Sequence, residues 1–232
     1  GGYGMSVVTA LVAQNTQGVR SVHVPPVDFL QEQLDSVIDD VEVDAVKIGM
    51  LADAAITAKV ADFLRRLPDD VPVVLDPVMV ATSGDRLLEK EAEQAVRDLC
   101  SQVDLITPNL KELAVLTQTD EASDLEQAIA TAKEWAKAAN TAVVVKGGHL
   151  HADIADNAVV NADGLVHRVA ASRVDTKNTH GTGCSLSSAL ATRLGAGDSP
   201  AAALAWSTQW LHEAIANADA LHVGKGHGPV DH

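Results

Sequence analysis

The run TKNTHGTGC at residues 176–184 holds the residues best suited to chemistry in this sequence. It precedes a long segment rich in Ala, Ser and Leu that has the pattern of a helix. Gly181 and Gly183 allow the backbone to turn its N–H groups inward, and the N-terminus of the helix adds partial positive charge. This combination predicts an anion hole for a phosphoryl group in transfer. Two glycines alone are weak evidence, because a flexible loop before a helix N-cap has the same pattern.

Cys184 follows the second glycine and would stand in the first turn of the helix. A helix N-terminus stabilises the thiolate form of a cysteine. A thiolate at that place can accept the proton of an attacking hydroxyl group, which is the role of a base in phosphoryl transfer. The alternative is a small, buried, apolar side chain, which is the usual state of a free cysteine.

Polar residues stand where four apolar runs end. These runs are predicted strands at residues 43–50, 73–80, 105–107 and 142–146. Their ends carry the sequences KIGM at 47–50, DP at 76–77, TPN at 107–109 and KGGH at 146–149. Ligands of parallel sheets bind at the carboxyl ends of the strands, so the four ends together favour one shared site. Taken singly, each polar residue is also consistent with a loop that caps a helix.

Segments with helical periodicity alternate with the predicted strands, at residues 28–40, 53–67, 89–100, 110–116 and 124–139. Residues 157–161 and 165–171 have the pattern of a β-hairpin with Ala-Asp-Gly at its turn, and two further helices are predicted at 183–194 and 199–217. The alternation predicts an α/β fold whose parallel sheet carries helices on both faces. No repeat, linker or low-complexity tract divides the chain, so we expect one domain.

The composition is that of a globular protein, since 47% of the 232 residues are hydrophobic and 21% are charged. The net charge of −15 disfavours nucleic acid and anionic lipid as partners. No apolar run has the length of a membrane span, and the N-terminus lacks the features of a signal peptide. The two cysteines fit a reducing compartment, and no Cys/His cluster has zinc spacing, the pair His149 and His151 included. We therefore expect a cytoplasmic protein that acts on a small molecule, without a membrane partner.

Six runs together resemble the hydroxymethylpyrimidine/phosphomethylpyrimidine kinases of thiamine biosynthesis: YGMSVVTALVAQNTQGV, KIGML, LDPVMVATSGD, LITPNLKE, VVVKGGH and TKNTHGTGCSLSSALA. The resemblance extends from Tyr3 to the closing GHGPVDH. It implies a ribokinase-like, three-layer α/β/α sandwich with a mostly parallel central sheet, as a single kinase domain over residues 1–232. It also implies that ATP and Mg²⁺ serve to phosphorylate 4-amino-5-hydroxymethyl-2-methylpyrimidine and then its monophosphate.

The resemblance assigns catalysis to the glycine-rich run. Cys184 would be the base, at the position where sugar kinases of this superfamily carry an aspartate, and Gly181, Thr182 and Gly183 would form the anion hole. Lys146, which ends an apolar run, would neutralise charge on the ATP phosphates, and both Lys146 and Gly183 would contact ATP. The alternative for Lys146 is a surface lysine whose stem lies along apolar residues.

Asn109 and Glu112 match the N-x-x-E motif of the superfamily. The resemblance implies that this motif holds Mg²⁺ largely through water, which suits an ion that loses its water reluctantly. Asp76 would contribute to the same acidic area, so Asp76 and Glu112 are the expected metal residues. Asn109 and Thr179 would also contact ATP. Glu112 could equally complement the dipole of the helix that it begins, and the two roles are compatible.

Gln14, in the run AQNT, corresponds to a pyrimidine-contacting glutamine of the family. An amide can both donate to and accept from an aminopyrimidine edge. Met50, in the run KIGM, would pack on the ring. The alternatives are an ordinary hydrogen bond at a strand end for Gln14 and packing in the core for Met50.

Two other functions remain open at this point. A pyridoxal/pyridoxine kinase would share the fold, the anion hole and the chemistry. A catalytically silent binding or assembly domain is disfavoured, because it would not need Gly181, Gly183, Cys184 and Lys146 together.

The family also has a strand and a glycine-rich loop, similar to AGSDPSGGAG, followed by an aspartate that contacts the pyrimidine. The sequence begins with GGYG, beyond these features, so we expect that roughly 30 residues, or one strand–helix unit, are missing. We therefore expect a fragment of a longer polypeptide, a larger fused protein included. As for partners, we also consider a homodimer.

Overall fold

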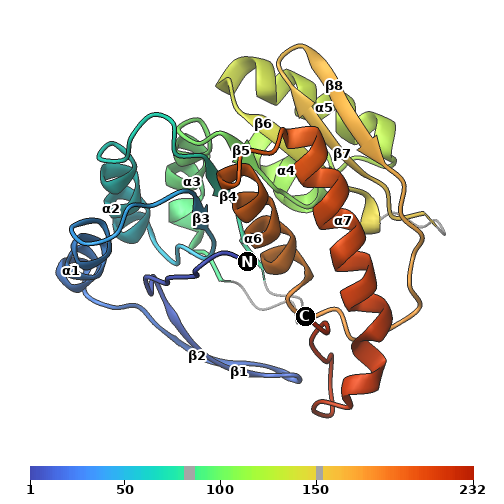
Figure 1. The fold of residues 1–232 in the computed structure, drawn as a ribbon, viewed down its shortest axis with the longest axis horizontal. Coiled ribbons are helices and arrows are strands. Elements are labelled where there is room, and N and C mark those ends of the chain that lie inside the picture. The colour runs from blue at the N-terminus through green and yellow to red at the C-terminus, as the bar shows by residue number, and fades with distance from the viewer. Residues whose placement is uncertain (81–86, 150–153) are drawn as a thin grey trace.

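A computed structural model describes residues 1–80, 87–149 and 154–232. Its centre is a six-stranded sheet in which neighbours in space are also neighbours in sequence (Figure 1). The first three pairings are parallel and the last two are antiparallel. The strands are β3 (Val46–Ile48), β4 (Val73–Leu75), β5 (Leu105–Ile106), β6 (Ala142–Lys146), β7 (Asn157–Asn161) and β8 (Gly164–Val169).

Helices cover both faces of this sheet, which confirms the expected three-layer α/β/α arrangement (Figure 1). Among the described residues, no helix has the length and apolar character that crossing a membrane requires. The helices are α1 (Val27–Ile38), α2 (Ala54–Leu64), α3 (Glu93–Cys100), α4 (Leu110–Thr117), α5 (Leu125–Ala139), α6 (Thr182–Gly195) and α7 (Pro200–Asn217), with short 3-10 turns η1 (Lys90–Ala92), η2 (Gly147–His149) and η3 (Ala218–Leu221).

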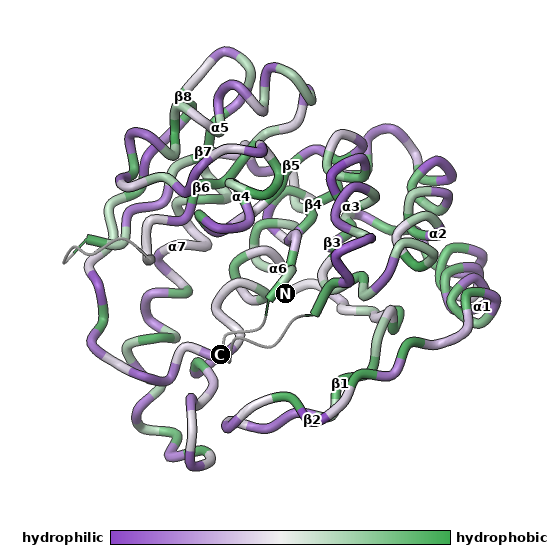
Figure 2. The backbone as a smooth tube through the Cα atoms, turned by 180° about the vertical axis from the view of Figure 1, so that it is seen from behind, coloured by the Kyte–Doolittle hydropathy of each residue, from purple (hydrophilic) through white to green (hydrophobic). Residues whose placement is uncertain are grey.

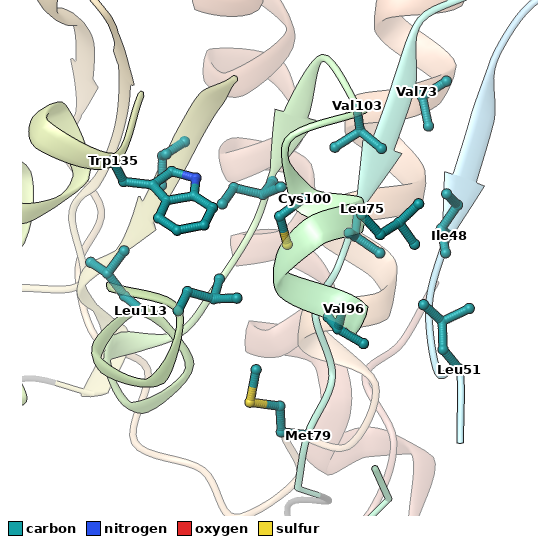
Figure 3. Close-up of a cluster of buried hydrophobic side chains, with 14 of the residues drawn as sticks. Ile48, Leu51, Val73, Leu75, Met79, Val96, Cys100, Val103, Leu113 and Trp135 are labelled. Carbon is teal, nitrogen blue, oxygen red and sulfur yellow. The ribbon is translucent and has the colours of Figure 1, made fainter. Parts of the chain in front are cut away.

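Alternate residues of the same strands build the two halves of the core. Val74 and Val144 pack with Leu190 in the layer of α6 and α7. Their neighbours Leu75 and Val143 face the opposite layer, which is formed by α1 to α5. Figure 3 shows part of this second cluster. Because successive side chains of a strand point to opposite faces, a strand covered on both sides must be apolar throughout, as the predicted strands are.

Two strands end well before their apolar runs do, while β5 and β8 end only slightly earlier than predicted, at Ile106 and Val169. The run at 73–80 forms β4 only as far as Leu75, because Pro77 has no N–H to donate to a ladder. The run at 43–50 forms β3 only as far as Ile48, the partner of Leu75, so β3 loses its neighbour at the same level. After β3 and β4 the polypeptide therefore leaves the sheet at the same edge, and the polar residues that follow these two strands can form a site there.

A hairpin outside the main sheet is a feature that the sequence did not predict. It consists of β1 (Leu11–Asn15) and β2 (Gly18–His23), which pair antiparallel to form a separate two-stranded sheet. Figures 1 and 2 show it standing apart from the layered body. None of its residues is fully buried, so its sequence lacks the alternation of polar and apolar residues that marks a half-buried strand.

Candidate active site

Three residues from distant parts of the chain meet at the carboxyl edge of the sheet. Asp76 follows β4, Lys146 ends β6, and Gly183 lies in the first turn of α6. The Nζ of Lys146 is 3.5 Å from Oδ1 of Asp76. A Cβ atom on Gly183 would lie 3.4 Å from Oδ2 of Asp76 and 3.7 Å from Nζ of Lys146. The N-terminus of α6 therefore adjoins the ion pair, and the absence of a side chain at Gly183 allows this approach.

The ion pair is largely withdrawn from solvent. The side chain of Asp76 is 3% exposed and that of Lys146 is 14% exposed. The hydroxyl of Thr107, a fully buried residue just past β5, donates to the same Oδ1 of Asp76 at 2.9 Å. Buried charges require partners of this kind, because isolated ions are costly to remove from water. Lys146 thus points into the protein and is not a surface lysine.

The start of α6 has the geometry of an anion-binding loop. Gly181 is its N-cap and has a φ of +89°, a left-handed conformation that favours glycine. The N–H of Thr182 donates to the carbonyl of Thr179 at 3.3 Å, which closes the turn that leads into the helix. The first N–H groups of a helix have no acceptor within it and carry its positive partial charge. Gly183, in this first turn, lies next to the ammonium group of Lys146.

The two cysteines have opposite environments. Cys184, in the first turn of α6, is exposed, so it is not the buried apolar residue that was the alternative. Cys100, at the end of α3, is fully buried. Burial, together with the nearby charge of Glu112, raises the pKa of the Cys100 thiol to about 12. Only Cys184 is therefore accessible to a substrate.

Asn109 and Glu112 form a capping box at the start of α4. The N–H of Glu112 donates to Oδ1 of Asn109 at 2.9 Å, and the N–H of Asn109 donates to Oε2 of Glu112 at 2.8 Å. Burial raises the pKa of Glu112, the charge of Lys146 opposes this rise, and the charge of Asp76 adds to it. Glu112 thus caps its helix and belongs electrostatically to the strand-end cluster, so the two readings of this residue are compatible.

The two carboxylates suit an ion that is held mainly through water. In the part of the chain that the structure describes, no group of three or more His, Cys, Asp or Glu side chains could hold a metal ion. Magnesium commonly uses only one or two carboxylates, keeps several water molecules, and takes further ligands from substrate phosphates. Asp76 lies close enough to Glu112 for its charge to raise the pKa of Glu112, so the two carboxylates fit such a donor set.

The remaining predicted site residues lie outside this cluster. Gln14 is exposed on β1, in the separate hairpin. Met50 is half-buried two residues past β3, where its carbonyl accepts a hydrogen bond from Oγ1 of Thr9 at 2.6 Å. Thr179 is half-buried and contributes its carbonyl to the turn before α6. The run LDPVMVATSGD lies outside the described residues from position 81 onward, as does His151.

Two features of the site escaped the sequence analysis. The run TPN was recognised as polar, but nothing in it indicates that Thr107 bonds to Asp76, since that contact joins two neighbouring strands. The glycine-rich segment at residues 224–228, which contacts the loop before α6 through Gly228 and Asn178, was noted only from Gly226 onward and only as part of a resemblance. Its glycine spacing nevertheless signals a close backbone approach.

Comparison with known sequences gives matches along the whole chain. Residues 1–231 match the family model described as phosphomethylpyrimidine kinase. The chain is 60% identical to a thiamine biosynthesis multifunctional protein ThiED of Corynebacterium efficiens, over all of this chain but 31% of that protein. It is 46% identical to a hydroxymethylpyrimidine/phosphomethylpyrimidine kinase of Salmonella typhimurium, over all of this chain and 87% of that protein. The chain thus spans about a third of the length of the Corynebacterium relative.

The fold is also similar to a solved enzyme structure. A pyridoxal kinase of Bacillus subtilis, in an ADP complex, superposes with a TM-score of 0.86 at 29% sequence identity. The match covers 99% of this chain and 86% of that chain. It agrees with the ribokinase-like sandwich described above.

The raised pKa of Glu112 predicts a specific dependence of stability on pH. The folded state holds this proton more tightly than the unfolded chain, in which the carboxyl has its ordinary pKa of 4.5. The stability that the bound proton contributes is therefore full below pH 4.5 and is lost as pH rises through the folded pKa. Glu112→Gln removes this loss. The free energy of unfolding of the variant, relative to wild type, should therefore rise with pH above the unfolded value, as measured by urea denaturation.

The matched control is Glu121→Gln, because Glu121 is exposed. Its difference from wild type should stay flat over the same pH range. A flat difference for Glu112→Gln as well would contradict the raised pKa.

Proposed function

The chain belongs to the phosphomethylpyrimidine kinase family, and we propose that it transfers the γ-phosphoryl group of ATP to 4-amino-5-hydroxymethyl-2-methylpyrimidine and to its monophosphate in thiamine biosynthesis. The observation that carries this proposal is the meeting of Asp76, Lys146 and Gly183 at the N-terminus of α6. An ammonium group beside helix N–H groups is suited to the charge of a phosphoryl group in transfer.

Lys146 and the start of α6 share the work of binding phosphate. Gly181, Thr182 and Gly183 would surround the phosphoryl oxygens, with the N–H groups of Gly181 and Gly183 as donors because the N–H of Thr182 donates to Thr179. Lys146 would neutralise the charge of these oxygens. Asp76 holds the ammonium group of Lys146 at 3.5 Å, and Thr107 in turn holds Asp76. The orientation of Lys146 is thus set before a nucleotide binds, which lowers the cost of positioning it.

Cys184 is the proposed base. Its exposed sulfur would accept the proton of the substrate hydroxyl, while the oxygen forms a bond to the γ-phosphorus and the bond from that phosphorus to the β-phosphate oxygen of ATP breaks. ADP is the leaving group. The place of Cys184 in the first turn of α6, next to the proposed anion hole, supports its role as the base.

Asp76 and Glu112 are the residues that would hold Mg²⁺, through its water molecules. When bound, the ion would neutralise charge on the phosphates. Asn109, which fixes Glu112 through the capping box, and Thr179, next to the turn into α6, are the proposed further contacts of ATP. Asn109 thus adjoins a proposed metal residue, and Thr179 adjoins the proposed anion hole.

Gln14 and Met50 are the proposed contacts of the pyrimidine. Met50 follows β3, the strand next to the one that leads to Asp76. Gln14 lies on the β1–β2 hairpin, and the segment that leads into this hairpin is tied to Met50 by the hydrogen bond from Thr9. A ring held here would lie at the carboxyl edge of the sheet, where ligands of such sheets bind.

A second candidate function is pyridoxal kinase, because the fold superposes on that of the Bacillus subtilis enzyme. An assay of ATP consumption with each alcohol distinguishes the two. We expect a higher kcat/KM for the hydroxymethylpyrimidine than for pyridoxal, and turnover of the pyrimidine monophosphate as well. A preference for pyridoxal would support the second candidate, and turnover of neither alcohol would contradict both.

Replacement of the proposed base gives a sharper test. Cys184→Ala should lower kcat by about 10²- to 10⁴-fold, the usual contribution of a positioned general base, while ADP binding measured by calorimetry persists. The matched control is Cys100→Ala, whose thiol is buried in the core and cannot reach a substrate. Unchanged kcat in Cys184→Ala would remove this residue from the mechanism.

We also propose that this kinase domain is part of a longer polypeptide, as in the multifunctional relative of which it matches 31%. Intact mass spectrometry of the natural protein should give a mass well above the 24.2 kDa of these residues. A mass equal to that value would contradict the proposal. The homodimer and the cytoplasmic location stay predictions.

A further inference from the structure

The tip of the β1–β2 hairpin is bonded to a segment near the other end of the chain. The Oγ1 of Thr16, in the turn between the two strands, accepts from the N–H groups of Lys225 at 3.2 Å and Gly226 at 3.1 Å. The carbonyl of Thr16 accepts from the N–H of His227 at 2.8 Å. One residue of the hairpin thus makes three hydrogen bonds to consecutive residues that follow it by about 210 positions.

Glycines make this contact possible. A Cβ atom on Gly224 would lie 2.3 Å from Oγ1 of Thr16, and one on Gly226 would lie 1.9 Å from its carbonyl oxygen. On the opposite side, a Cβ atom on Gly228 would lie 2.5 Å from Oδ1 of Asn178. These distances leave no room for a side chain. The spacing GKGHG at residues 224–228 therefore suits a segment whose backbone is in close contact with other residues on two sides.

The second side belongs to the loop that precedes α6. The N–H of Gly228 donates to Oδ1 of Asn178 at 2.8 Å, and the N–H of His180 donates to the carbonyl of Gly228 at 3.0 Å. Asn178 is held in turn by Asp219, which accepts from its Nδ2 at 2.7 Å. The loop continues directly into the N-cap of α6. Residues 224–228 thus connect the hairpin tip to the loop of the proposed anion hole.

The hairpin needs such a contact because it has little support of its own. A two-stranded sheet is marginally stable in isolation, and none of its residues is fully buried. The segment leading into it is held by Val8, whose backbone exchanges two hydrogen bonds with the side chain of Gln33. At the tip, the support comes from Thr16. Gln14 lies two residues before Thr16, so the position of Gln14 depends on that contact.

We propose that residues 224–228 form a clasp that fixes the pyrimidine-binding end of the hairpin relative to the anion hole, with Thr16 as its positioning residue. This inference rests on the proposed function, because that function assigns the pyrimidine contact to Gln14. The clasp keeps the acceptor hydroxyl of the substrate and the phosphoryl group in a fixed relation, although the residues that would bind them are far apart in the sequence.

The test compares Thr16→Val, which removes the acceptor oxygen, with Thr16→Ser, which keeps it. The matched control is Thr192→Val, because among the described residues the Thr192 hydroxyl bonds within its own helix, to the carbonyl of Ser188. Thr16→Val should raise the KM for the pyrimidine alcohol about tenfold and change the KM for ATP by less than about twofold, as expected for loss of one or two hydrogen bonds at one site. Thr16→Ser should restore the wild-type KM.

Hydrogen exchange measured on the same full chain provides a readout that does not depend on activity. In Thr16→Val, the amides of residues 11–23 and 224–228 should exchange faster than in wild type and in Thr192→Val. Unchanged exchange would overturn the clasp, and faster exchange with an unchanged KM for the pyrimidine would overturn the positioning role. If the wild-type protein turns over pyridoxal instead, the KM for pyridoxal takes the place of that for the pyrimidine. If it turns over neither alcohol, the proposed function fails and, with it, the positioning role, while exchange still decides whether the clasp exists.

Discussion

The contact between Lys146 and Asp76 is the interaction around which the site of this protein is built. Both side chains are largely buried, and loss of one partner from a buried pair typically costs about 3–5 kcal/mol because the other charge is left uncompensated. The pair is tolerated because Thr107 supplies a further donor and because Gly183 lets the positive end of α6 come close. Strands β4, β5 and β6 must therefore end at the same level, and α6 must begin beside them.

Packing of apolar side chains in the layered body fixes the positions of these strand ends. Valine and leucine side chains alternate between two apolar clusters, so the central strands are covered on both faces and their ends are held at defined positions. Early strand ends at Leu75 and Ile48 release polar residues to one edge of the sheet. Glu112 has two roles, since its carboxylate caps α4 and also lies within electrostatic reach of Lys146 and Asp76.

The hairpin follows a different principle. It buries little surface, so its position depends on a few directional contacts instead of a core. Those contacts come from Gln33 at one end and from residues 224–228 at the other. A protein that must hold two ligands together can place one on the rigid sheet and the other on a tethered arm, as the proposed function requires of Lys146 and Gln14.

The sequence by itself determined the features that depend on local chemistry. The β-branched run at 142–146 is the whole of β6, the hairpin strand at 157–161 is the whole of β7, and the N-x-x-E spacing that begins at Asn109 is a capping box. The family resemblance, carried by short runs of fixed wording, agreed with the comparisons. Each of these signals lies within a few residues of its effect, so it can be read without knowledge of the fold.

Only the tertiary structure decided which of these residues meet. Whether Lys146 points inward, whether Cys184 is exposed, and how deeply Glu112 is buried depend on packing between elements that are distant in the sequence. The bond from Thr107 to Asp76 and the grip of Gly224 and Gly226 on Thr16 are contacts between residues that are far apart along the chain, and no local pattern records the partner. The same holds for the hairpin, whose exposed strands are specified by their ends and not by a buried face.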